Sequence, residues 1–163
     1  SMSERVVVHT FPALYDNHSK VLILGSFPSR ISRELQFYYA NRTNRFWSVM
    51  EHIYNQQIAD RMQFCHKHRI ALWDVIASCS IKGSSDSSIQ NIQINPIAEL
   101  VNASSIETVF TTGKKAEQLY RKYIDISIPL IPLPSTSAAN AAMRLDDLID
   151  AYRIIKEYTD EEN

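Results

Sequence analysis

Two short stretches of this sequence, residues 25–29 and residues 133–140, contain the side chains best suited to hold a flat polar ligand. The first reads GSFPS and is followed by the aromatic, amide-containing segment FYYANRTNRFW at residues 37–47, and the second reads LPSTSAAN. Aromatic rings stack on planar ligands, while amides and hydroxyls fix their orientation by hydrogen bonding. A base turned out of a DNA duplex is a ligand of this kind.

Each of these stretches follows an apolar run that is typical of a buried strand. The runs are VLIL at residues 21–24 and PLIP at residues 129–132. In open α/β sheets, ligands bind beyond the carboxyl ends of the strands. We therefore expect the loops at 26–29, 39–44 and 135–137 to meet at one edge of a sheet and to form one pocket.

The composition narrows the class of protein. The 163 residues include 17 Lys and Arg against 18 Asp and Glu, a balance that argues against a protein that coats nucleic acid through charge. An enzyme that holds a few phosphates with amides and hydroxyls remains compatible with it. Cys65 and Cys79 lack CxxC spacing, so we expect free thiols and a cytoplasmic location. The sequence shows neither an apolar run of membrane-spanning length nor a signal pattern, so we expect no membrane association.

Several other chemistries find little support in the sequence. Three glycines are too few for a dinucleotide fingerprint or a P-loop. His66 and His68 stand two residues apart in a predicted helix, which favours a solvated face over a metal site. A nucleophile elbow of the Ser/His/Asp hydrolases is missing from the sequence as well. We expect neither a metal nor another cofactor.

The elements that must position these loops alternate along the chain. Apolar runs separated by helical patterns predict a single α/β domain over residues 1–163, a three-layer α/β/α sandwich with a central, mainly parallel four-stranded sheet. The predicted strands lie at 21–26, 70–75, 108–112 and 130–133. One predicted helix starts at residue 45, three more cover 58–68, 96–102 and 114–123, and a long C-terminal helix starts at 145. Residues 82–91 are expected to form a loop.

The order of these motifs resembles the uracil-DNA glycosylase superfamily, and within it most closely the hypoxanthine-DNA (DNA-deoxyinosine) glycosylase branch. LWDVI around Asp74 and KGSSDSSI at residues 82–89 are similar to that branch too. The resemblance runs from about residue 9 to the C-terminal helix. It implies a metal-free, monofunctional hydrolase that flips a deaminated base, hypoxanthine first, out of double-stranded DNA and leaves an abasic site. We expect the protein to act as a monomer.

The resemblance assigns the catalytic role to Asn44. In the mismatch-specific uracil glycosylases an Asn that positions water stands where this chain has Phe27, and in the hypoxanthine branch the counterpart of Asn44 replaces it. Relatives usually carry His-Pro where this chain has Asn41 and Arg42. The Asn44 carbonyl can accept a hydrogen bond from the water that attacks C1′, and orientation dominates because the sugar resembles an oxocarbenium ion. Alternatively, Asn44 caps the helix that follows, and both roles can hold together.

The remaining site residues follow from the same loops. Tyr39 is expected to stack on the base, with Phe27 on the pocket floor and Ser26 beside the base, although core packing is the alternative for both aromatics. Phe37, Phe46 and Trp47 are assigned to the core. One of residues 135–137 is expected to cap the C-terminal helix, whose positive end would then face a phosphate. The predicted DNA-binding residues are Ser29, Ser84, Ser85, Asp86, Ser87, Ser135, Thr136 and Ser137.

Some alternatives stay open at this stage. Residues 84–88 are equally consistent with a solvated loop, and either Asp86 or Asp74 could assist catalysis. Two other functions compete with a hypoxanthine glycosylase. One is a uracil or mispair glycosylase, and the other is a non-catalytic module that binds nucleobases or damaged DNA. A phosphate-binding signalling domain is disfavoured because a glycine-rich loop is missing.

Overall fold

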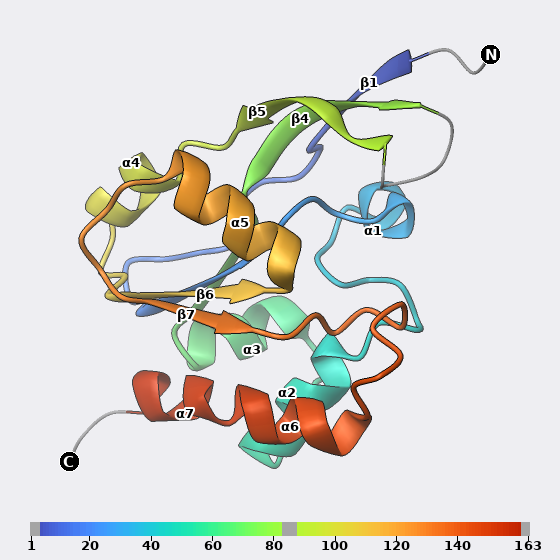
Figure 1. The fold of residues 1–163 in the computed structure, drawn as a ribbon. Helices are drawn as coiled ribbons and strands as arrows, with labels where there is room; N and C mark the ends of the chain where they lie inside the picture. The colour runs from blue at the N-terminus through green and yellow to red at the C-terminus, as the bar shows by residue number, and fades with distance from the viewer. Residues whose placement is uncertain (1–3, 83–87, 161–163) are drawn as a thin grey trace.

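Four parallel strands form the central sheet of the computed structural model, which describes residues 4–82 and 88–160 (Figure 1). They run in the order β3-β2-β6-β7, so the first strand of this sheet lies inside it, between the second and the third. The reversal of strand order between β2 and β6 is the point at which open α/β sheets bind ligands. The strand bounds are β2 Val21–Gly25, β3 Ile70–Asp74, β6 Thr108–Thr112 and β7 Leu130–Leu133.

Helices cover both faces of this sheet because both faces of its strands are apolar. In β2, Val21 and Ile23 pack into one core cluster and Leu22 and Leu24 into the other, as the alternation of side chains along a strand requires. The first cluster is closed by α2 Phe46–Tyr54, α3 Arg61–Lys67, α6 Leu145–Tyr152 and α7 Ile154–Thr159. The second is closed by α4 Ile97–Asn102 and α5 Lys114–Tyr123. The predicted three-layer α/β architecture is confirmed (Figure 1).

A second sheet, which the sequence did not lead us to expect, lies beside α4 and α5. Its three strands pair antiparallel in the order β1-β4-β5, with bounds Glu4–Val8, Ile76–Lys82 and Gln90–Ile94. Residues 90 and 91, which we expected in a loop, belong to β5. The sheet escaped notice because its register joins residues far apart in sequence, such as Val7 and Cys79. Local alternation alone specifies such short strands weakly.

The C-terminal helix also differs from the expectation. It begins at Leu145 as predicted, but it is divided at Arg153 into α6 and α7. Its cap is Arg144, whose backbone N–H donates to the Asp147 carboxylate at 2.9 Å. Residues 135–137 therefore do not cap this helix, and the prediction that its positive end lies at their loop was wrong. The seven residues 138–144 separate this loop from the first residue of α6, whereas a capping side chain acts within one turn.

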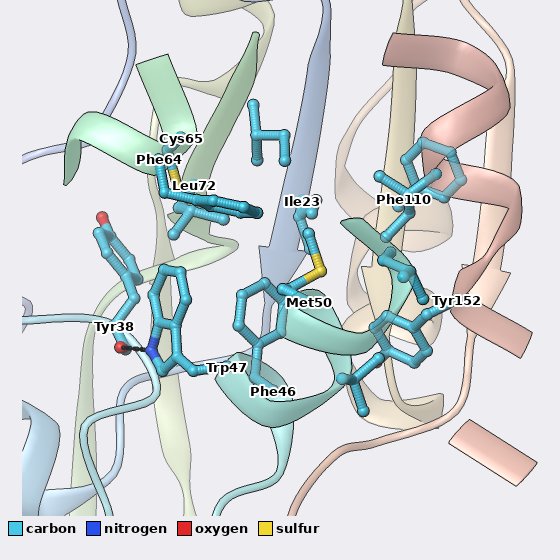
Figure 2. Packing of buried hydrophobic residues seen from close by; sticks show 14 of the residues in the cluster. Ile23, Tyr38, Phe46, Trp47, Met50, Phe64, Cys65, Leu72, Phe110 and Tyr152 are labelled. Atoms are coloured by element: carbon cyan, nitrogen blue, oxygen red, sulfur yellow. Dashed lines mark hydrogen bonds between the residues drawn. The ribbon is translucent and has the colours of Figure 1, made fainter. Parts of the chain in front are cut away.

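Aromatic rings of several elements pack together in the first core cluster (Figure 2). Phe46 and Trp47 at the start of α2 are buried, and Phe37 packs against them, as predicted. The Trp47 indole N–H donates to the Tyr38 carbonyl at 3.0 Å, which ties the segment before α2 to the helix itself. This packing fixes the start of α2 and, with it, the position of Asn44, the residue before Arg45.

Candidate active site

A cavity of about 210 Å³ opens at the carboxyl end of the parallel sheet, at the switch between β2 and β6. It is lined by residues 25–29, by parts of 38–44 and by 135–138, together with Asp74 and Thr112 from the ends of β3 and β6. The prediction that the three loops share one pocket is confirmed. The volume is below the roughly 300–1,000 Å³ of pockets for drug-sized ligands, which suits a single small ring system.

Asn44 lies half-buried in the wall of this cavity, with its side-chain oxygen fully engaged. Oδ1 accepts from the Phe46 backbone N–H at 2.9 Å and from the Thr136 hydroxyl at 2.8 Å. A backbone N–H can only donate, so this contact identifies the oxygen of the amide. Both lone pairs of Oδ1 are used, whereas Nδ2 has no hydrogen-bond partner among the described residues. Asn44 thus makes a cap-like contact with α2 and also forms part of the pocket wall.

Arg45 attaches the loop after β7 to the start of α2. Its guanidinium donates from Nη2 to the carbonyls of Ser137 and Asn140 at 2.8 and 3.1 Å, and from Nη1 to the Met143 carbonyl. Its backbone N–H donates to the Thr136 carbonyl at 3.1 Å. The planar guanidinium, with five donors, suits such a set of carbonyls. Sequence reasoning missed Arg45, since one charge at the start of an apolar helix gives no sign of its partners.

The hydroxyls of the 135–137 loop serve mainly to shape that loop. Ser135 Oγ accepts from the Ser137 N–H and Ser137 Oγ accepts from the Ala139 N–H, each at 3.2 Å. These are local turns of the kind that serine favours. Thr136 is only 2 % exposed and directs its hydroxyl to Asn44. All three residues line the cavity, and their contact with DNA stays a prediction.

The Tyr39 ring lines the cavity but one of its faces is already covered. It stacks on Phe46 with ring centroids 4.0 Å apart and an interplanar angle of 11°, so stacking on a base is open only to the opposite face. The backbone of Tyr39 has a φ of 52°, a conformation that is uncommon for a bulky residue. Its hydroxyl lies 3.3 Å from Thr112 Oγ1. Burial, with a smaller contribution from the Asp74 charge, raises the pKa of the Tyr39 hydroxyl far above its ordinary value.

Residues 26–29 form another part of the lining. Phe27 is half-buried, with the Arg33 guanidinium 5.3 Å from its ring centroid. The Ser26 carbonyl accepts from the Ile76 N–H at 2.9 Å, which fixes the backbone of this loop. Ser29 Oγ accepts from the Ser32 N–H at 3.1 Å and caps α1, Arg30–Leu35. The predicted residues Ser84, Ser85, Asp86 and Ser87 lie outside the described residues.

Asp74, at the end of β3, pairs with a histidine that sequence reasoning did not single out. His9 Nε2 lies 2.8 Å from Asp74 Oδ2, and the two side chains are 3 % and 6 % exposed. Burial raises the pKa of the Asp74 carboxyl, and the contact with His9 lowers it in part. A Cβ added to Gly25 would lie 2.6 Å from Asp74 Oδ1, so only glycine lets the carboxyl approach β2 this closely. The two residues are 65 positions apart in the sequence, so no local pattern predicts this contact.

Comparison with known proteins decides the family. The model of the uracil DNA glycosylase superfamily matches residues 12–156, almost the whole described chain. The chain belongs to the uracil DNA glycosylase superfamily. A protein of Methanosarcina acetivorans named hypoxanthine DNA glycosylase is 33 % identical over 136 residues, which cover 80 % of this chain and 86 % of that protein. Its namesake in Methanosarcina barkeri is 30 % identical over 112 residues, or 65 % of this chain and 71 % of that protein.

A solved structure supports the same placement within the superfamily. The solution NMR structure of a candidate uracil DNA glycosylase from M. acetivorans superimposes with a TM-score of 0.72 at 32 % identity, covering 90 % of this chain and 96 % of that one. The prediction that this chain is a DNA glycosylase of the superfamily is confirmed. Within the described parts of the chain, no helix is long and apolar enough to cross a membrane. The same residues contain no group of three or more His, Cys, Asp and Glu that could hold a metal ion.

Proposed function

We propose that this glycosylase removes hypoxanthine from deoxyinosine in double-stranded DNA, acting on the base after it has been flipped out of the helix. The observation that carries the proposal is the meeting of Asn44, Tyr39, Phe27 and the 135–137 loop in one small pocket at the sheet's switch point. The names of the two Methanosarcina relatives support hypoxanthine as the base. The products are the free base and an abasic site.

In the proposed reaction, the pocket separates the tasks of holding the base and holding the water. The face of Tyr39 that does not stack on Phe46 and the ring of Phe27 contact the flipped base, and Ser26 lies beside it. The Asn44 amide orients the water that attacks C1′. Because Oδ1 is engaged with Phe46 and Thr136, the Nδ2 end is the part of this amide that is available to the water. A water that accepts from Nδ2 keeps a second lone pair for C1′, and little basicity is needed when the sugar is close to an oxocarbenium ion.

The proposal includes modest, non-specific contacts with the DNA backbone. The net charge of −1 limits the number of phosphates that the protein can neutralise. Ser29, Ser135 and Ser137 at the cavity rim suit hydrogen bonds from hydroxyls and backbone N–H groups to phosphate oxygens. We further propose that the enzyme acts as a monomer in the cytoplasm.

The experiment that tests the function uses matched duplex oligonucleotides. Each duplex carries inosine, xanthine, uracil or a normal base at one position, and released base is detected by alkaline cleavage of the abasic site. We expect cleavage with inosine and none with the normal bases. Cleavage with uracil alone would replace the proposal by a uracil glycosylase, which the superfamily match also allows. Binding to damaged duplex without any base release would instead identify a non-catalytic module.

A further inference from the structure

Asp74 is the one carboxylic acid among the described residues that line the cavity, and it lies at the carboxyl end of β3. Its Oδ1 atom lies beside Gly25, the residue from which the cavity-lining GSFPS loop begins. Its backbone is held as well, because Asn95 Nδ2 donates to the Asp74 carbonyl at 2.8 Å. The carboxyl is therefore a fixed, buried group at the binding site.

His9 determines which oxygen of this carboxyl is left to carry a proton. Its Nε2 contacts Oδ2, and its Nδ1 is buried and has no hydrogen-bond partner among the described residues. The imidazole lies among the rings of Phe11, Phe27 and Tyr38, at centroid distances of 4.5, 6.3 and 5.9 Å. A doubly protonated ring would bury an unpaired N–H donor and a charge there, which is costly.

The arrangement with the lowest cost is a neutral imidazole that donates Nε2–H to Oδ2. Nδ1 then presents only an unpaired lone pair to the aromatic rings, and Oδ2 acts as an acceptor. Any proton on the carboxyl must consequently be carried by Oδ1. This is the oxygen beside Gly25 at the cavity.

We propose that Asp74, oriented by His9, is the general acid that protonates the departing base, an inference that rests on the proposed glycosylase function. As the bond between C1′ and N9 breaks, its electron pair passes to the purine, and the proton of Oδ1 moves to a ring nitrogen or to O6 of that purine. The water oxygen bonds to C1′ and releases one proton to solvent, from which the Asp74 carboxylate is protonated again. The products are neutral hypoxanthine and the abasic sugar.

The chemistry of the leaving group favours such an acid. Without a proton, hypoxanthine must leave as an anion, and a positioned acid typically accelerates such a step by about 10²–10⁴-fold. Burial raises the pKa of Asp74, which keeps a proton on the carboxyl to higher pH than in an exposed aspartate. The titratable groups that face it are His9, from the segment after β1, and Tyr38 and Tyr39, from the segment before α2.

The test is the pH profile of single-turnover base release from the inosine duplex for wild type, Asp74→Asn and His9→Phe. Wild type should lose rate as pH rises through the pKa of Asp74, because the acid is then deprotonated. Asp74→Asn keeps the shape and can still accept from His9, but it should be slower by about 10²–10⁴-fold and lack this decline. His9→Phe should move the decline to higher pH, because the contact with His9 lowers the pKa of Asp74. The exposed variant Asp150→Asn serves as the control with unchanged rate and profile.

Two results would overturn the inference while the proposed function stands. One is a folded Asp74→Asn enzyme with the rate and pH profile of wild type, and the other is a slower variant that keeps the wild-type decline. The carboxyl ¹³C chemical shift of Asp74 against pH gives a readout besides activity, and a carboxylate that is fully ionised wherever the enzyme is active would exclude the acid role. Absence of base release by wild type from every modified duplex would instead refute the proposed function itself.

Discussion

The Asn44 side chain joins α2 to the loop after β7 and also forms part of the cavity wall. If it orients the attacking water, Asn44→Ala should lower single-turnover release of hypoxanthine by about a hundredfold or more. Loss of its contact with the Phe46 N–H should cost about 1 kcal/mol of stability. Binding to the inosine duplex should change much less, because affinity depends mainly on phosphate and stacking contacts. Rates and binding are measured with the same duplex, well below the melting temperature.

Asn44→Asp separates the possible roles of this amide. Aspartate keeps an oxygen for Phe46 and Thr136, and its second oxygen, in the place of Nδ2, can accept a proton from water. We therefore expect it to retain more activity than Asn44→Ala. Activity at or below that of the alanine variant would mean that Nδ2 has to act as a hydrogen-bond donor, a role that an aspartate oxygen cannot fill. A folded alanine variant with the wild-type rate would leave Asn44 with a purely structural role.

Position 25 requires glycine because a side chain there would collide with the Asp74 carboxyl. Gly25→Ala should lower both stability, by about 1–3 kcal/mol, and base release, because the new methyl group displaces Oδ1. The two effects are measured by urea unfolding and by single-turnover kinetics. In an Asp74→Ala background the same substitution should cost markedly less stability, since the atom that it meets is gone. Equal costs in both backgrounds would show that the methyl group strains something else.

At the scale of elements, Arg45 holds the loop of residues 134–144 against α2 in place of a helix cap. Lysine keeps the charge but cannot donate to several carbonyls in one plane. Arg45→Lys should therefore cost about 2 kcal/mol in the free energy of unfolding, because several partly buried carbonyls lose their donors. Base release should fall too, since Thr136 positions Asn44. The exposed neighbour Arg42→Lys is the control and should lie within about 0.5 kcal/mol of wild type in urea unfolding. A similar cost for both variants would contradict this account of the loop.

At the scale of the whole molecule, the raised pKa of Asp74 links stability to pH. An unfolded aspartate loses its proton near pH 3.9, at about the value of model peptides, whereas the folded carboxyl holds its proton to higher pH. Between the unfolded and the folded pKa, the folded state binds more protons than the unfolded state. The stability that this group contributes is therefore fully present below the unfolded pKa and is lost as pH rises through the folded pKa. Relative to Asp74→Asn, wild type should lose stability over this interval in urea unfolding. A difference between the two proteins that does not change with pH would contradict the assignment.

A second prediction for the whole molecule concerns chelation. Because the described residues offer no cluster of three metal-ligating side chains, and the proposed chemistry uses water, an amide and a carboxyl, EDTA should leave base release unchanged. The assay compares wild-type rates on the inosine duplex before and after dialysis against the chelator. Loss of activity that a divalent ion restores would reveal a metal site in the protein.

The sequence by itself determined the parallel sheet, most of the helices that cover it and the identity of the loops at the site. Strand β6 and helix α5 have the predicted bounds, because continuous apolar runs and helical spacing are local patterns that each segment carries within itself. The GSFPS and LPSTS motifs lie at the carboxyl ends of β2 and β7 for the same reason. Parallel strands necessarily bring such ends to one edge, so the shared pocket was predictable too.

Only the tertiary structure decided how the polar groups of that pocket are paired. The contacts of Asp74 with His9 and of Asn44 with Thr136 span 65 and 92 residues of sequence. The antiparallel sheet that brings His9 to the site rests on pairing between β1 and β4, whose paired residues are 70 to 78 positions apart in the sequence. A hydrogen bond depends on distance and angle between two particular atoms, and these are set by the packing of both core clusters together. The local pattern therefore identifies which residues reach the pocket, while the global packing determines which of their atoms remain available for chemistry.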